Sequence, residues 1–137
     1  MPGTNDPDAP VFYVYEYSAK GRIFYVGSGW TTRASDRVDH VERLMNRESK
    51  GQDVHWVNSN RVIRALKFEY GLEIEISYPV TGETQAEARR FEKEITRKRL
   101  QEGCMLANIV GNPRRLSTEQ VIQYVLTGEL PVAKDSS

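Results

Sequence analysis

The chain has 137 residues and no net charge, because 19 lysines and arginines balance 19 aspartates and glutamates. This length favours one domain with a single modest core, and 39% hydrophobic residues are ordinary for a globular protein. Bulk charge alone is not expected to hold a neutral chain to nucleic acid, and a single cysteine, Cys104, excludes an internal disulfide framework. The lone cysteine suits a reducing cytosol, so we expect a cytoplasmic protein with no membrane span.

The N-terminal third predicts a hairpin followed by a helix. Residues 1–10 are rich in proline and are expected to be a flexible segment rather than a signal peptide. Aromatic and β-branched residues predict strands over 11–17 and 22–27, and SAKG between them suits a turn. The GSGWTT that follows is predicted to be a loop ending in a threonine cap. A helix is predicted over 33–47, with an apolar stripe of Ala34, Val38, Val41 and Met45.

The middle of the chain predicts a loop, a helix and a strand. Residues 48–57 are polar and are expected to form the loop. A second helix is predicted over about 59–70, ending at Gly71. LEIEISYPV, at 72–80, alternates apolar and polar residues as a half-buried strand does.

Two capping boxes predict the last two helices. Thr84 and Glu87 open one that runs to about Glu102, and Ser117 and Gln120 open another, closed by glycine. The order of elements predicts an α/β (α+β) domain over 11–130, followed by a flexible tail over 131–137. Its sheet is expected to be small and antiparallel, with about three strands flanked by helices.

Charged residues of the first predicted helix fall into a stripe. Arg33, Arg37 and His40 are spaced i, i+4 and i+7, so helical geometry places them on one side of the helix. Three cationic or titratable groups in a row can hold a phosphate, and they can equally form a solvated helix edge. Both interpretations stay open from the helix residues alone.

Two polar residues of the C-terminal half fall among apolar ones. Glu92 lies near Ala88 on the inward stripe of the third predicted helix. A buried carboxylate needs a partner, which a metal ion or a structural arginine can supply. Asn108 lies in LANIVGN, ahead of a turn predicted at GNP, and an asparagine in such a stretch usually satisfies nearby backbone groups.

Together these pieces resemble the GIY-YIG nuclease family. The residues that carry the resemblance are, in chain order, Tyr13-Val14-Tyr15, Tyr25-Val26-Gly27, Arg33, Glu92 and Asn108. They cover about residues 11–112, with valine in place of isoleucine in both motifs and tyrosine in place of the leading glycine. The helix offers both Arg33 and Arg37 where the family has one arginine, and the loop spacing favours Arg33.

The resemblance implies a metal-dependent endonuclease that hydrolyses phosphodiester bonds of nucleic acid, with DNA favoured as the substrate. It implies one Mg²⁺ (or Mn²⁺) per site, bound by Glu92 and water, because a hard carboxylate with a water-rich shell suits this ion. Arg33 would clamp the phosphate with Arg37 beside it. Gly27 and Ser28 are expected to contact the substrate.

The resemblance also implies a route for the proton of the attacking water. Tyr15 would receive it, assisted by Tyr25 or His40. A free phenol with a pKa near 10 is a poor base at neutral pH, so the arginine and the metal are expected to lower the pKa of Tyr15. Asn108 would position Glu92 or the backbone around it.

An alternative stays open beside the nuclease. A catalytically inactive nucleic-acid-binding or protein-interaction domain on the same fold would suit the zero net charge. The complete set of two tyrosines, arginine, glutamate and asparagine argues against it. The resemblance implies an intracellular protein of bacterial or phage type. A monomer with one site would nick one strand, so double-strand cutting would require a homodimer.

Overall fold

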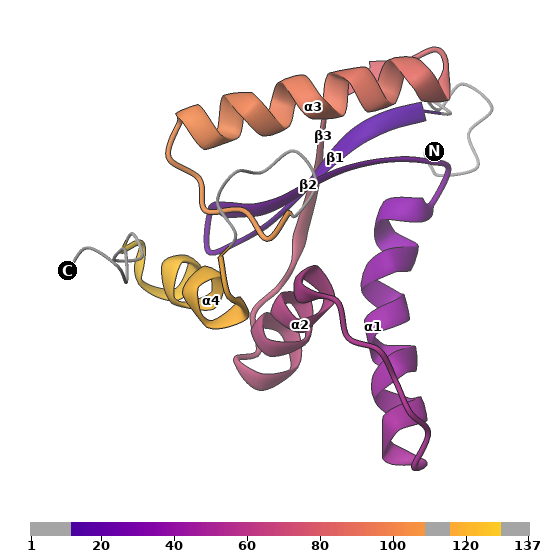
Figure 1. Cartoon of the computed structure of the whole chain (residues 1–137), viewed down its shortest axis with the longest axis vertical. Coiled ribbons are helices and arrows are strands. Elements are labelled where there is room, and N and C mark those ends of the chain that lie inside the picture. The colour runs from indigo at the N-terminus through magenta and orange to yellow at the C-terminus, as the bar shows by residue number, and fades with distance from the viewer. Residues whose placement is uncertain (1–11, 109–115, 130–137) are drawn as a thin grey trace.

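The computed structural model describes residues 12–108 and 116–129, and its elements follow the predicted order (Figure 1). They are β1 (Phe12–Ala19), β2 (Arg22–Trp30), α1 (Arg33–Ser49), α2 (Asn58–Arg64), the π-helical turn η1 (Ala65–Glu69), β3 (Glu75–Gly82), α3 (Gln85–Gln101) and α4 (Thr118–Thr127). The α+β class with a three-stranded antiparallel sheet is therefore confirmed. The expected flexible ends, 1–10 and 131–137, and the turn expected at 111–113 lie outside the described residues.

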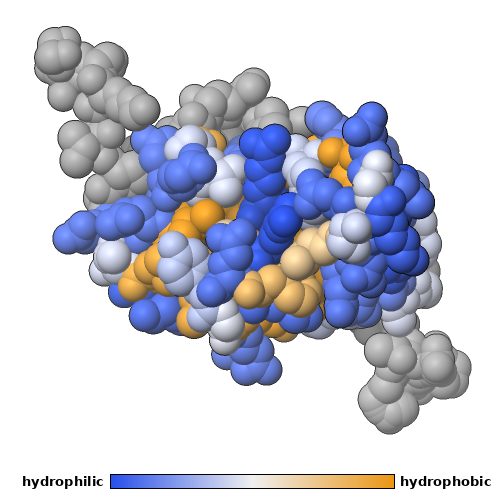
Figure 2. All heavy atoms as spheres, turned by 90° about the horizontal axis from the view of Figure 1, so that it is seen from below, coloured by the Kyte–Doolittle hydropathy of each residue, from blue (hydrophilic) through white to orange (hydrophobic). Residues whose placement is uncertain are grey.

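The sheet has the order β2-β1-β3, with β1 in the centre. Figure 1 shows α3 lying along one face of the sheet, while α1, α2 and α4 lie on the other side. Seen from that other side, hydrophilic residues cover most of the surface and hydrophobic residues show as separate patches (Figure 2). None of the described helices is long and apolar enough to cross a membrane.

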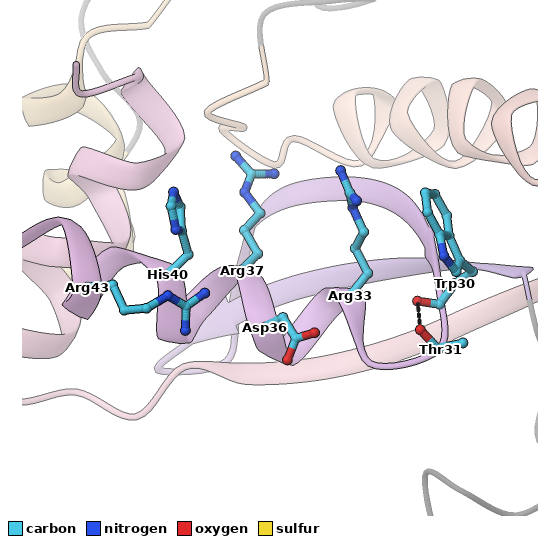
Figure 3. Close-up of a pocket in the computed structure, with 7 residues that line it drawn as sticks. All are labelled: Trp30, Thr31, Arg33, Asp36, Arg37, His40 and Arg43. Carbon is cyan, nitrogen blue, oxygen red and sulfur yellow. Dashed lines mark hydrogen bonds between the residues drawn. The ribbon is translucent and has the colours of Figure 1, made fainter. Parts of the chain in front are cut away.

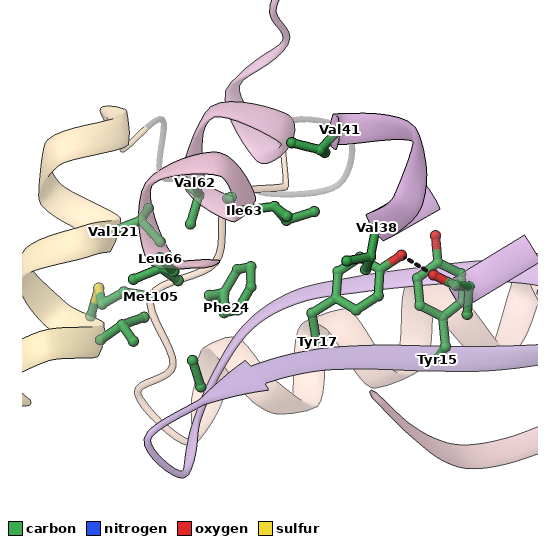
Figure 4. Close-up of a cluster of buried hydrophobic side chains, with 14 of the residues drawn as sticks. Tyr15, Tyr17, Phe24, Val38, Val41, Val62, Ile63, Leu66, Met105 and Val121 are labelled. Carbon is green, nitrogen blue, oxygen red and sulfur yellow. Dashed lines mark hydrogen bonds between the residues drawn. The ribbon is translucent and has the colours of Figure 1, made fainter. Parts of the chain in front are cut away.

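Each face of the sheet supports its own core, because alternate residues of a strand point to opposite faces. Toward α1, α2 and α4, the core includes the tyrosines of β1 and Phe24, packed on α1 and α2 side chains (Figure 4). Toward α3, Val14, Val26 and Leu106 form a smaller cluster with Phe91 and Ile95. The two cores hold the helices of both sides against the central strand.

Three details of the predicted elements are corrected. The GSG segment is part of β2, not a loop, because Gly27 and Gly29 pair with β1 residues and the strand continues to Trp30. The threonine cap does not form, since Thr32 occupies the cap position without a side-chain cap bond. The buried stripe of α1 includes Leu44, whereas Met45 is half-buried.

The second predicted helix is interrupted. It consists of α2 (Asn58–Arg64) and the π-helical turn η1 (Ala65–Glu69), and Gly71 follows with a φ of 68°. A glycine takes this left-handed conformation readily, which supports its predicted role as a helix stop. The capping box expected at Ser117 is complete, whereas at Thr84 the side chain accepts from the Glu87 amide but the Glu87 carboxylate bonds to the amide of Glu83 instead.

A buried ion pair joins β1 to α3. Glu16 is 2% exposed, and its carboxylate accepts hydrogen bonds from Arg99 and, at 3.4 Å, from the Ser77 hydroxyl. Hydrogen bonding to Glu16 raises the pKa of Arg99 above its ordinary value, against the effect of burial. This pair fixes the rotation of α3 on the sheet.

We expect the Arg99→Met substitution to destabilise the fold by about 3–5 kcal/mol, because it leaves the buried Glu16 charge without a partner. Arg97 is exposed on the same helix, so Arg97→Met should change the free energy of unfolding by no more than about 0.5 kcal/mol. Urea unfolding of both variants measures the difference. Equal stabilities would contradict the assigned role of the pair.

Candidate active site

Three tyrosines of β1 form a row on one face of the sheet. Tyr13, Tyr15 and Tyr17 are all buried, and Gly29 and Gly27 of β2 lie opposite the first two. A Cβ atom on Gly27 would lie 2.6 Å from Cζ of Tyr15 and 2.7 Å from its hydroxyl oxygen. The Tyr15 ring therefore occupies a space on β2 that only a glycine leaves open.

The hydroxyl groups of this row anchor the start of α1. Tyr13 donates a hydrogen bond to the carbonyl of Thr31 at 2.7 Å and accepts one from the amide of Ala34 at 3.2 Å. Tyr17 donates to the carbonyl of Ala34 at 2.6 Å. Buried phenols need such partners, and these bonds set the direction in which the next turn of α1 projects Arg37.

Arg37 lies against the second motif tyrosine. Its Cζ is 4.4 Å from the centroid of the Tyr25 ring, and its guanidinium donates a hydrogen bond to the Ser59 hydroxyl of α2. Burial alone would lower the pKa of Arg37, but the oxygens of Tyr25 and Tyr15 raise it above its ordinary value. The guanidinium therefore stays charged beside the tyrosine pair.

Tyr15 lies behind Tyr25, with the two ring centroids 6.2 Å apart. Burial raises the pKa of the Tyr15 hydroxyl, the neighbouring Tyr25 raises it further, and Arg37 lowers it only in part. In the protein alone the contribution of Arg37 is outweighed, so the pKa of Tyr15 is raised overall, and the expected lowering by arginine and metal together stays a prediction. At neutral pH this hydroxyl is a neutral hydrogen-bonding group rather than a phenolate.

Arg33 and His40 lie apart from the tyrosine pair. Arg33 is exposed, and its guanidinium is 4.8 Å from the Trp30 ring centroid. His40 is also exposed, and both residues line a recess of about 420 Å³ along α1 that Arg37 shares. Figure 3 shows Arg33, Arg37 and His40 extending to the same side of the helix. The predicted stripe is therefore present, but Arg37 rather than Arg33 reaches the tyrosines.

The length of β2 bears on why Arg37 rather than Arg33 lies against Tyr25. We expected β2 to end at Gly27, and the loop spacing favoured Arg33. The strand instead runs three residues further, to Trp30, and the guanidinium of Arg33, the first residue of α1, lies over the Trp30 ring. Arg37, one turn later, returns to the level of Tyr25.

Glu92 approaches the same strand from α3. It is half-buried, and its Oε1 accepts a hydrogen bond from the Ser28 hydroxyl at 2.7 Å. No basic side chain in the described part of the chain forms an ion pair with it. The structural arginine considered for Glu92 is thus not found among these residues, whereas Glu16 has such a partner.

Asn108 holds the edge of β2. Its Oδ1 accepts a hydrogen bond from the amide of Val26 at 3.1 Å, and its Nδ2 donates to the carbonyl of the same residue at 2.6 Å. The amide of Ala107 donates to the carbonyl of Phe24 at 2.7 Å. The expected contact with nearby backbone is therefore present, and it steadies the strand between Tyr25 and Gly27.

A recess of about 240 Å³ is lined by residues of β2, α2 and α3. Tyr25, Glu92 and Asn108 line it together with α2 residues, including Ser59. Its volume is enough for several water molecules, at about 30 Å³ each. A half-buried carboxylate that has no ion-pair partner among the described residues, beside such a space, fits one hydrated Mg²⁺. No group of three or more metal-ligating side chains exists among the described residues, so any ion here would keep most of its water.

Sequence reasoning missed Ser59 and Glu16. Ser59 falls at the start of a helix in the polar run NSN, where a buried hydroxyl has no sequence signal. Glu16 alternates with the tyrosines, and this alternation indicated that it faces away from them toward α3. That signal could have identified it as a buried carboxylate in need of a partner.

Comparison with known proteins gives no match: no family model, curated protein or solved structure matches the chain. The family resemblance drawn from the motifs therefore stays a prediction. What the site can do follows from its own residues and their geometry.

We expect Gly27→Ala to destabilise the protein by about 1–3 kcal/mol, because the added methyl group overlaps the Tyr15 ring. Gly29→Ala is the matched control. Its nearest contacts are Cβ and Cγ of Arg33 at 3.1 Å, a smaller overlap than the 2.6 Å approach at Gly27. Urea unfolding compares the two variants, and an equal or larger loss in Gly29→Ala would refute the close-approach argument.

Proposed function

We propose that the chain is a metal-dependent endonuclease that hydrolyses phosphodiester bonds of nucleic acid, with DNA as the expected substrate and a GIY-YIG-type site. The observation that carries this proposal is that an arginine, a tyrosine and a glutamate from three separate elements lie close together. Arg37 of α1 stacks on Tyr25 of β2, and Tyr25 shares a recess with Glu92 of α3. A purely structural arrangement has no need of a half-buried carboxylate that forms no ion pair with another described residue.

Arg37 would bind the phosphate. One of its nitrogens donates to Ser59, and an arginine has five N–H donors in a rigid fork, so others can face a phosphate oxygen. The guanidinium is charged at physiological pH, because the pKa of Arg37 stays above its ordinary value despite burial. Positive charge beside a phosphoryl group stabilises the charge that develops as the bond breaks.

The two tyrosines would orient the attacking water by hydrogen bonds. Tyr25 lines the recess, and its hydroxyl is the one we assign to the water next to the phosphate. Tyr15 lies behind it and is neutral at physiological pH, so it can both accept and donate a hydrogen bond. His40, on the outer recess, would contact substrate rather than the reacting atoms.

Glu92, oriented by Ser28, would hold the ion. When bound, Mg²⁺ stabilises negative charge on the phosphoryl oxygens and lowers the pKa of coordinated water. Asn108 would keep the Tyr25–Gly27 strand in place. Each chain carries one such site, so double-strand cutting would need two copies.

A nicking assay on supercoiled plasmid tests the proposal. The protein should nick DNA in Mg²⁺ or Mn²⁺ and should bind DNA without cleaving it in Ca²⁺. Nicking should be absent in EDTA. Glu92→Gln should abolish nicking and keep binding, because the ion loses its protein carboxylate. Binding without nicking by the wild-type protein would instead support the inactive nucleic-acid-binding alternative.

Thermal unfolding separates a metal ligand from a structural residue. Glu92 lacks an ion-pair partner in the described residues, so Glu92→Gln should change stability by less than about 1 kcal/mol. Glu94→Gln, exposed on the same helix, is the control and should keep both activity and stability. An active Glu92→Gln protein that is clearly less stable would contradict the assigned role.

The two arginines of α1 should differ in activity. Arg37→Lys keeps the charge but loses the planar fork, and we expect cleavage to fall by about 10²-fold or more. At saturating DNA, where a loss of binding does not slow the single-turnover rate, Arg33→Lys should cleave within a few-fold of wild type, because Arg33 lies over Trp30. Single-turnover cleavage rates measure both variants. Loss of activity in Arg33→Lys but not in Arg37→Lys would identify Arg33, which the loop spacing favoured, as the arginine that binds the phosphate.

A further inference from the structure

Trp30 is an exposed indole next to the candidate site. It ends β2 and keeps 37% of its surface exposed, whereas most aromatic residues of β1 and β2 are buried or half-buried. It lines two recesses, one of about 420 Å³ along α1 and one of about 140 Å³ toward α3. The indole therefore forms the ridge between two hollows of the surface.

Arg33 covers the indole. Its Cζ is 4.8 Å from the ring centroid, and Figure 3 shows the two side chains side by side at the end of the α1 row. Nucleobases stack on aromatic rings and on guanidinium planes, and such stacking is tolerant of base sequence. The pair thus offers the two kinds of surface that an unpaired base uses.

Both hollows beside the ridge are basic. Arg37, His40 and Arg43 line the one along α1. Asp36 is the one acidic residue among its described lining residues, and it accepts a hydrogen bond from Thr32 at 2.8 Å. The other contains Arg89 of α3 and no acidic lining residue among those described. Backbone phosphates on either side of a stacked base would meet positive charge.

The ridge is also close to the proposed chemistry. Ser28, which donates to Glu92, lines the same recess as Trp30. On the other side, Arg37 lines the recess that Trp30 and Arg33 share. A base stacked on Trp30 would therefore belong to a nucleotide near the phosphate held at the site.

We propose that the Trp30–Arg33 pair is a stacking platform for an unpaired nucleobase next to the cleaved phosphate, so that the substrate carries a single-stranded segment at the cleavage site. Bases inside a continuous duplex are covered by their neighbours on both faces and leave no face for the indole. That this phosphate is the cleaved one rests on the proposed nuclease function. The stacking of the base itself does not require catalytic turnover.

The fluorescence of Trp30 tests the platform directly. Trp56 is the other tryptophan of the chain. Its indole donates a hydrogen bond to Glu48 and lies under the guanidinium of Arg64, away from this recess. Trp56→Phe therefore leaves Trp30 as the single indole reporter. In EDTA, oligodeoxythymidine and oligouridine should each quench Trp30 emission saturably, and the two arms compare DNA with RNA. A duplex with a single-stranded overhang should quench more strongly than the same duplex with blunt ends.

Binding affinities give a second readout. Loss of one base–aromatic stack corresponds to about fivefold or more in Kd, so Trp30→Ala should weaken overhang binding by that factor while Trp30→Phe keeps most of it. Trp56→Phe should bind as wild type does. Quenching without any cleavage in Mg²⁺ would support the platform and refute the nuclease. Unchanged Trp30 emission, or equal overhang affinity in Trp30→Ala, would overturn the platform even in an active enzyme.

Discussion

The site depends on the tyrosine rings of β1, because Tyr13 and Tyr15 lie opposite glycines of β2 that have no side chain. Gly27 leaves room for the Tyr15 ring, since a single added carbon would lie 2.6 Å from it. With the rings in this position, the hydroxyls of Tyr13 and Tyr17 reach the first turn of α1 and bond to its backbone. The same packing therefore shapes the floor of the site and sets where α1 projects Arg37. The abundance of tyrosine in the hairpin has this structural purpose as well as any chemical one.

Two inward carboxylates have opposite surroundings. Glu16 is buried and bonded to Arg99, which fixes α3 on the sheet. Glu92, on that helix, is half-buried and has a serine hydroxyl as its hydrogen-bond donor. Burying a charge is tolerated when it is paired, and Glu92 has no cationic partner among the described residues, which favours a ligand over a stabilising role. Glu16 thus positions the helix that carries Glu92.

Much of the fold could be predicted from periodicity and capping signals, because those are local properties. The alternation in β1 and the inward turn of Glu92 were predicted for this reason, and both agree with the structure. The position of Arg37 could not be predicted, since it depends on how far β2 continues past Gly27. The raised pKa of Tyr15 likewise depends on burial by α1, which no local pattern reveals. The catalytic roles themselves stay predictions.

The central claim is that phosphodiester chemistry takes place where Tyr25, Arg37 and Glu92 converge. The most direct measurement is the single-turnover rate of strand cleavage in Mg²⁺ for Tyr25→Phe, with Tyr78→Phe as an exposed-tyrosine control. We expect Tyr25→Phe to unfold at the wild-type temperature and to cleave about 10²–10⁴-fold more slowly, because it loses one positioned hydroxyl. Tyr78→Phe should cleave at the wild-type rate. Cleavage by Tyr25→Phe at the wild-type rate would contradict the account.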